Sequence, residues 1–180
     1  MTEAEHYVRM LNNRVSSQEA ERAQKWLLEH PTEGHPVLLE YLQKRGAETK
    51  RIIQFLPSFN DPSAIPLLCQ IIKEEHSYSV DAAISLGRYR DLAATECLFS
   101  FLKGSIIHKN AALVGLRSQK RDSSCPLIID LLKDKDSDIR WQALKTADVL
   151  ECLNKEILES ISQDPSEDVQ ELLRVIRSKR

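Results

Sequence analysis

Five histidines and four cysteines are the side chains in this sequence most typical of transition-metal sites. Three histidines directly follow a glutamate, in the pairs Glu5–His6, Glu29–His30 and Glu75–His76. Imidazole and carboxylate groups ligate metals when several of them meet at one point. Because the chain repeats every 30 residues and these pairs fall at different positions of the repeat, we do not expect them to converge. His35 and His108 are also out of phase, so all five are interpreted as surface or helix-end residues and no metal is expected.

The cysteines give no sign of a site either. Cys69, Cys97, Cys125 and Cys152 are widely separated, form no CxxC pair and lie among apolar residues. We predict reduced, buried thiols that pack as small hydrophobic side chains, in place of a metal cluster or a disulfide framework. The sequence also lacks a phosphate-binding loop, a nucleophile elbow and a zinc motif. We therefore expect no catalytic residues and no cofactor.

Two short stretches rich in lysine and arginine lie 30 residues apart. The first holds Arg88 and Arg90, and the second holds Arg117, Lys120 and Arg121. Equal positions in neighbouring units lie about 10 Å apart by ordinary helix packing. These five cations then share one basic ridge, which an acidic protein surface, a phosphate or a nucleic acid could bind. The alternative interpretation is that they only stabilise the C-terminal ends of helices.

Composition indicates an ordinary globular helical protein. Hydrophobic residues make up 42% and charged residues 29% of the 180-residue chain, whereas aromatic residues make up only 6%. Scarce aromatic residues and only 5 glycines disfavour a β-sandwich or barrel. A net charge of −2 argues against a generally basic nucleic-acid binder. Since the sequence has no membrane-spanning apolar run and starts without a signal peptide, we expect a cytoplasmic protein. A monomer is the expected oligomeric state.

The positions of apolar residues repeat with a period of 30. One column is Leu38, Leu68, Leu98, Ile128 and Leu158, and another is Ala23, Ile53, Ala83, Leu113, Ala143 and Leu173. Further columns lie one, four or five residues away, which is the spacing of one helix face. Each unit therefore predicts two helices, here called helix A (the Ala23 column) and helix B (the Leu38 column).

Helix-capping signals divide these columns into twelve predicted helices. Thr2 with Glu5 and Ser16 with Glu19 have capping-box spacing, while Asp61-Pro62 and Asp164-Pro165 are typical of helix starts. The helices are expected near residues 3–14, 17–30, 36–45, 47–57, 62–75, 78–88, 92–103, 107–118, 123–133, 138–150, 154–163 and 166–178. The predicted fold is all-α: an α-solenoid of about five antiparallel helix pairs with half-repeat caps at both ends, one domain over 1–180. Polar outer faces at both ends suggest a complete small protein.

Two units resemble a known family. Ser137-Asp138-Ile139-Arg140 with Ala143 and Ala147, and the stretch 81–87, are similar to HEAT repeats. The 30-residue spacing is most similar to the short phycobilisome-lyase-type HEAT-like repeats, and the resemblance covers nearly the whole chain. It implies antiparallel helices with helix A on the convex side and helix B on the concave side. The first unit departs from the pattern, with Pro31 and Gly34 in its expected inter-helix turn.

On that arrangement, helix B positions beside the core columns should line a concave groove that binds a partner. These are Leu39, Glu40, Gln70, Lys73, Phe99, Lys103, Ile129, Asp130 and Lys133. Phe99 is a candidate anchor, since aromatic side chains often dominate protein interfaces. Alternatively, the apolar members only widen the core, and the lysines only stabilise helix ends. Trp141 lies off the core columns of its A helix and is expected to be partly exposed on the convex side.

We therefore favour a non-enzymatic scaffold or adaptor that binds a protein partner through the concave helix B surface and the basic ridge. A solenoid offers a large preformed surface that needs little ordering on binding. Two alternatives remain open. One is a chromophore lyase-like or chaperone-like subunit, similar to the bilin lyases that use these repeats. The other is a nucleic-acid binder, which Glu40, Asp130 and Glu159 oppose.

Overall fold

A computed structural model describes residues 1–11, 16–89, 91–119 and 124–179, and these ranges contain helices and turns without a strand. The α-helices are α1 (Glu3–Arg9), α2 (Ser17–Glu29), α3 (Pro31–Lys44), α4 (Thr49–Phe55), α5 (Ile65–Lys73), α6 (Ser79–Arg88), α7 (Leu92–Phe101), α8 (Ile106–Gln119), α9 (Cys125–Asp130), α10 (Ser137–Val149), α11 (Lys155–Ser160) and α12 (Glu167–Ser178). Short 3₁₀ turns η1 (Leu56–Phe59), η2 (Pro62–Ala64) and η4 (Leu131–Lys133) extend three of them. The all-α prediction is confirmed.

The capping boxes that were predicted at the first two helices are present. The Glu5 amide donates to Thr2 Oγ1 at 3.1 Å, and the Thr2 amide donates back to Glu5 Oε2 at 2.7 Å. Ser16 and Glu19 make the same reciprocal pair at α2. Asp164 differs from the prediction, because α12 begins at Glu167 after Ser166. The Asp164 carboxylate instead binds the Arg140 guanidinium.

The first unit also differs from the prediction. Helix α3 begins at Pro31, five residues before the expected start, so Pro31 and Gly34 lie in the helix and not in a turn, and Pro36 lies inside it. Pro31 fits because the first helical position needs no amide hydrogen. Gly34 fits because a Cβ there would lie 2.8 Å from Leu27 Cδ2 and 3.2 Å from the Leu27 carbonyl oxygen, so any larger residue would require Leu27 to shift.

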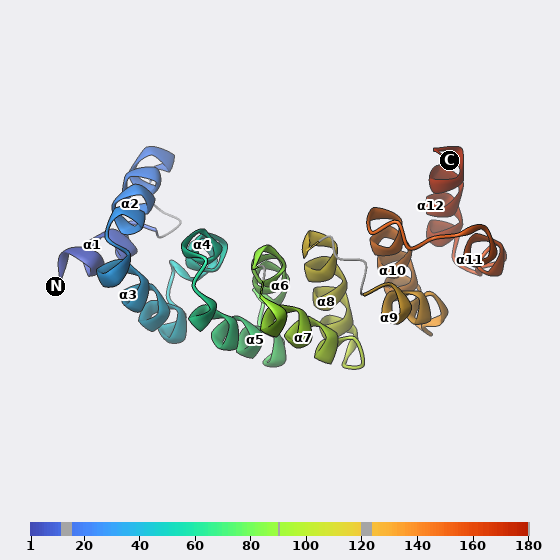
Figure 1. The fold of residues 1–180 in the computed structure, drawn as a ribbon, viewed down its shortest axis with the longest axis horizontal. Coiled ribbons are helices and arrows are strands. Elements are labelled where there is room, and N and C mark those ends of the chain that lie inside the picture. Colours follow the sequence, from blue (N-terminus) through green and yellow to red (C-terminus); the bar gives the residue numbers. More distant parts are fainter. Residues whose placement is uncertain (12–15, 90, 120–123, 180) are drawn as a thin grey trace.

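The helices form two rows along an open arc. Figure 1 shows the even-numbered helices on the inner, concave side and the odd-numbered helices on the outer side. The repeat columns face the core between the rows, where Leu38, Leu68, Leu98 and Ile128 are fully buried. The even-numbered helices are the A helices of the sequence, so the expectation that A is convex and B concave is wrong.

Side-chain size explains this sense of curvature. Small residues are buried between neighbouring even-numbered helices, namely Ala82, Ala83, Gly87, Ala111, Ala112, Gly115, Ala143 and Ala147. Both rows also bury large residues, but the odd-numbered helices and the turns that follow them bury fewer small ones, and leucine and isoleucine predominate there, namely Leu68, Ile71, Ile72, Leu98, Leu102, Ile128, Leu131 and Leu132. Small residues let helix axes approach closely, whereas large ones hold them apart. The row with the smaller residues is therefore the shorter, inner row.

The expectation of four reduced thiols is wrong in this structure, which pairs all four cysteines. Cys69 forms a disulfide with Cys97, with their Cα atoms 6.3 Å apart, and Cys125 with Cys152, at 5.4 Å. The separations of 28 and 27 residues are close to one repeat, so each pair lies on neighbouring units. A search for CxxC motifs misses such pairs because the repeat, and not local spacing, brings the thiols together.

Removing either disulfide should destabilise the protein moderately. Cys97→Ala and Cys152→Ala are each expected to lower the free energy of unfolding by about 2 kcal/mol, since the bridge restricts the unfolded chain. This is the lower end of the usual range, because neighbouring helical segments already restrict a denatured chain. Urea denaturation with and without reductant measures the effect. Four titratable thiols in the wild-type protein without reductant would contradict the pairing.

Candidate functional site

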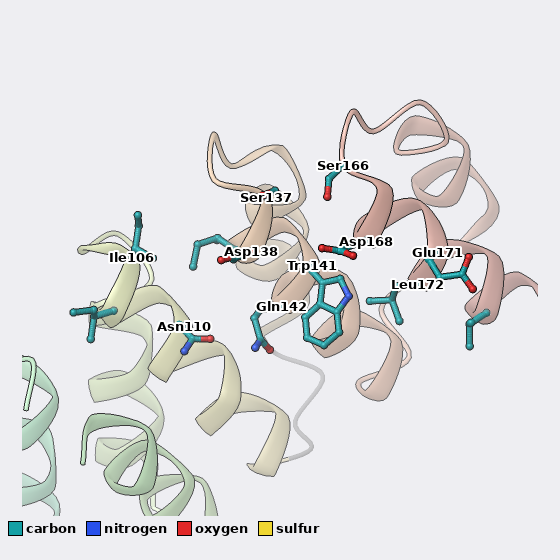
Figure 2. A pocket seen from close by; sticks show the side chains of 13 residues that line it. Ile106, Asn110, Ser137, Asp138, Trp141, Gln142, Ser166, Asp168, Glu171 and Leu172 are labelled. Atoms are coloured by element: carbon teal, nitrogen blue, oxygen red, sulfur yellow. The ribbon is translucent and has the colours of Figure 1, made fainter. Parts of the chain in front are cut away.

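A large cavity lies on the inner side of the arc, between α8, α10 and α12. It has a volume of about 740 Å³ and opens to solvent. Its walls are three successive even-numbered helices. The cavity therefore spans two neighbouring helix–helix contacts of the inner row. We call this cavity the inner groove; Figure 2 shows the side chains that line it.

Large apolar side chains form much of the groove and are unusually exposed. Ile106 and Ile107 of α8 are 50% and 45% exposed, and Val175 of α12 is 40% exposed. Trp141 of α10 and Leu172 of α12 are half-buried and lie between them. Figure 2 shows Leu172 pointing from α12 toward the Trp141 ring. Several exposed apolar side chains around one cavity of a folded chain are typical of a binding surface.

Carboxylates line the groove beside the apolar residues. Asp138 and Asp168 lie in the first turns of α10 and α12, where the helix dipole stabilises a negative charge. Within the described ranges, neither carboxylate forms an ion pair. Glu171 also lines the groove, but it is 2.8 Å from Arg174 Nη1. The uncompensated negative charge of the groove therefore comes from Asp138 and Asp168.

The Trp141 ring has one cation close by. Lys145 Nζ lies 4.7 Å from the ring centroid, a cation–π contact within α10. Trp141 is partly exposed, as the sequence predicted, but it lines the inner groove on a helix of the inner row and does not lie on the convex side. Trp141 therefore forms an aromatic wall of the groove, near the first turns of α10 and α12 that carry Asp138 and Asp168.

The helix B residues that were predicted to bind a partner lie on the outer row. Leu39, Phe99 and Ile129 are half-buried and pack against the core, which fits the interpretation that this line widens the core. The polar members are exposed: Glu40, Gln70, Lys73, Lys103, Asp130 and Lys133. None of these nine residues lines the inner groove. They do not share a concave surface, because the odd-numbered helices form the outside of the arc.

Only part of the predicted basic ridge can be placed. Arg90, Lys120 and Arg121 lie outside the described residues. Arg88 Nη1 donates to the Gln54 carbonyl at 2.8 Å, and Arg117 Nη1 donates to Gln142 Oε1 at 3.3 Å. Burial lowers the pKa of Arg117. Each of these two arginines therefore connects neighbouring even-numbered helices.

One histidine differs from the surface interpretation. His35 is buried within α3, with Nδ1 3.4 Å from Asp61 Oδ2, and it borders a cavity of about 260 Å³. Burial lowers its pKa, an effect that Asp61 partly opposes. Across the placed part of the chain, no three histidine, cysteine or acidic side chains are grouped so that they could hold a metal ion.

Sequence reasoning missed the inner groove because its most exposed apolar residues lie off the repeat columns, whereas Leu172, which does belong to one, was assigned to the core. Ile106 and Ile107 are adjacent apolar residues at the start of α8, and neither belongs to a column. This adjacent apolar pair outside the columns was the sequence signal that could have located the groove, because the core between the two rows does not bury it. None of the described helices is long and apolar enough to cross a membrane.

Comparison with known proteins supports the fold alone. No family model matches the chain, and no curated protein matches its sequence. Among solved structures, it resembles the crystal structure of an engineered protein from the Northeast Structural Genomics Consortium, with 17% identity and a TM-score of 0.53. The match covers 99% of this chain and 98% of the other. At this identity the likeness concerns the arrangement of the backbone.

Proposed function

We propose that this chain is an α-solenoid of short HEAT-like helix pairs that acts as a non-enzymatic scaffold and binds a protein partner in the inner groove. The observation that carries the proposal is the exposed apolar surface of Ile106, Ile107 and Val175 around Trp141. Burial of such surface is the main driving force of protein association. The groove replaces the outer helix B surface as the proposed binding surface.

The arrangement of the groove favours a scaffold role. Each of its three walls is a helix that packs on its neighbour, since α10 contacts both α8 and α12. A partner would therefore meet a surface that is already formed, and binding would cost little conformational entropy. A nucleic acid is not proposed as the partner, because Asp138 and Asp168 face the groove and would repel phosphates.

Selection from a random peptide library tests the proposal without a known partner. Fifteen-residue peptides displayed on phage would be selected on the full-length protein and then measured individually. We expect Ile107→Glu to lower the affinity of the selected peptides at least tenfold, because it places a charge among the groove's apolar side chains. Ile107 is already half-exposed, so the substitution should leave the fold intact.

Two control variants separate the inner groove from the outer surface. Leu92→Glu introduces the same charge at an outer residue that is 70% exposed, and Lys103→Glu changes the outer surface first predicted to bind. Both should bind the selected peptides as the wild type does. If the selected peptides still bind the Ile107→Glu variant but no longer bind the Lys103→Glu variant, the proposal is overturned and the outer surface becomes the binding surface.

A further inference from the structure

We propose that the partner segment is an amphipathic α-helix whose apolar face is flanked by two cations, lysine or arginine, seven residues apart. This inference rests on the proposed function and adds the shape and charge of the partner. It follows from three features of the inner groove: its helical walls, the spacing of Asp138 and Asp168, and its length.

The groove's walls favour a helix over an extended strand. A strand gains affinity by pairing with the open edge of a sheet, and the placed ranges contain no strand. The groove is instead formed by helices whose backbone groups are already paired within them. A helix satisfies its own backbone groups and needs only an apolar surface such as that of Ile107, Trp141 and Leu172.

The spacing of the carboxylates sets the spacing of the cations. Asp138 and Asp168 are 30 residues apart, so they occupy the same position on neighbouring even-numbered helices. Such helices pack about 8–10 Å apart. A partner helix that crosses them rises about 1.5 Å per residue, so this distance corresponds to about five to seven residues. Seven residues are close to two turns, which places both cations on one side of the partner.

The length of the groove sets the length of the partner. Three even-numbered helices span two packing distances, about 16–20 Å in total. A helix of about 11–14 residues covers that distance. Its apolar side chains would contact Ile106 and Ile107 at one end, Trp141 in the middle, and Leu172 and Val175 at the other. Figure 2 shows Ile106, Trp141 and Leu172 on three successive helices, together with Asp138 and Asp168.

Three synthetic helical peptides of 16 residues test the inference. All three carry the same leucine face. One has lysines seven residues apart beside that face, the second has the same lysines three residues apart, and the third has glutamates seven residues apart. Binding to the full-length protein is measured by fluorescence anisotropy at low salt. We expect the first peptide to bind about fivefold more tightly than the second, and the third most weakly, since exposed charge pairs contribute modestly.

Protein variants assign the preference to the two aspartates. Asp138→Asn with Asp168→Asn should remove the difference between the three peptides, and Asp138→Lys with Asp168→Lys should make the glutamate peptide the tightest. The matched control is Glu96→Gln with Glu156→Gln, which removes two exposed charges from the outer helices and should change nothing. If the lysine variant fails to fold, the asparagine variant, which keeps the shape of both side chains, decides alone.

The outcomes separate this inference from the proposed function. Equal binding of all three peptides, lost with Ile107→Glu, would overturn the charge preference and leave the groove as a binding surface. A lysine preference that survives the asparagine variant would also overturn it. Failure of these peptides, together with no library peptide that depends on Ile107, would overturn both.

Discussion

Replacing Arg140 with alanine is expected to lower the free energy of unfolding by about 3–5 kcal/mol. Arg140 Nε and Nη2 donate to the two carboxylate oxygens of Asp164 at 2.7 and 2.9 Å, and Nη1 donates to the Asp134 carbonyl at 2.9 Å. Both side chains of the ion pair are nearly buried. The alanine variant leaves the Asp164 carboxylate buried without its partner, which explains the size of the loss. Urea denaturation at neutral pH measures it.

A matched control and the pH dependence make this prediction specific. Arg174→Ala breaks an exposed ion pair with Glu171 and should cost at most about 0.5 kcal/mol. Hydrogen bonds from Arg140 lower the pKa of Asp164 in the folded protein. The stability that the pair contributes is therefore complete above the unfolded aspartate pKa of 3.8 and is lost as the pH falls through the lower folded value. Equal losses for the two variants at pH 7 would contradict the account.

Replacing Gly87 with valine should have the second large effect, a loss of about 3 kcal/mol. A Cβ at Gly87 would lie 2.3 Å from the Gly115 carbonyl oxygen and 2.7 Å from Ser118 Cβ. The first neighbour is helix backbone, so α6 and α8 would have to separate. Valine also has a higher helix propensity than glycine, so intrinsic propensity alone predicts the opposite sign.

Gly46→Ala is the control for the Gly87 prediction. A Cβ at Gly46 would contact only the flexible end of the Glu48 side chain, which can move away at little cost. Thermal and urea unfolding should place this variant within about 0.5 kcal/mol of the wild type. A Gly87→Val protein as stable as wild type would show that α6 and α8 do not approach closely, and would remove the explanation for the curvature.

The repeat made the helices and the core predictable from the sequence. Leu38, Leu68, Leu98 and Ile128 share one column and are all fully buried, because a residue at one position of the repeat meets the same surroundings in each unit. Helix boundaries were predictable where a capping box stood, as at Ser16 and Glu19. The start of α12 at Glu167 lies one residue from the expected 166, but the residue before it is Ser166 and not Asp164, whose carboxylate binds Arg140.

The direction of curvature and the groove were not predictable in the same way. Curvature depends on the difference in size between the residues buried in the two rows, such as Gly87 in one and Leu98 in the other. A column shows that a position is buried, but not how closely its helix approaches the next. Ile106 and Ile107 belong to no column, so a search for repeated positions passes over them.

The two disulfides bear on the predicted location. Disulfides form and persist mainly in oxidising environments and are rare in the reduced cytosol. The pairing of Cys69 with Cys97 and of Cys125 with Cys152 therefore does not favour the cytoplasmic location that the sequence suggested. That location stays a prediction, and thiol titration of the protein as it is isolated from its host would test it.

The most direct test of the inner groove is a hydrogen-exchange footprint of a bound peptide. The full-length protein would be exchanged alone and with the tightest peptide selected on it. The account predicts slower amide exchange in α8, α10 and α12, where the groove lies, and unchanged exchange in α5 and α7 on the outer row. Protection confined to the outer row, with α10 and α12 unchanged, would contradict it.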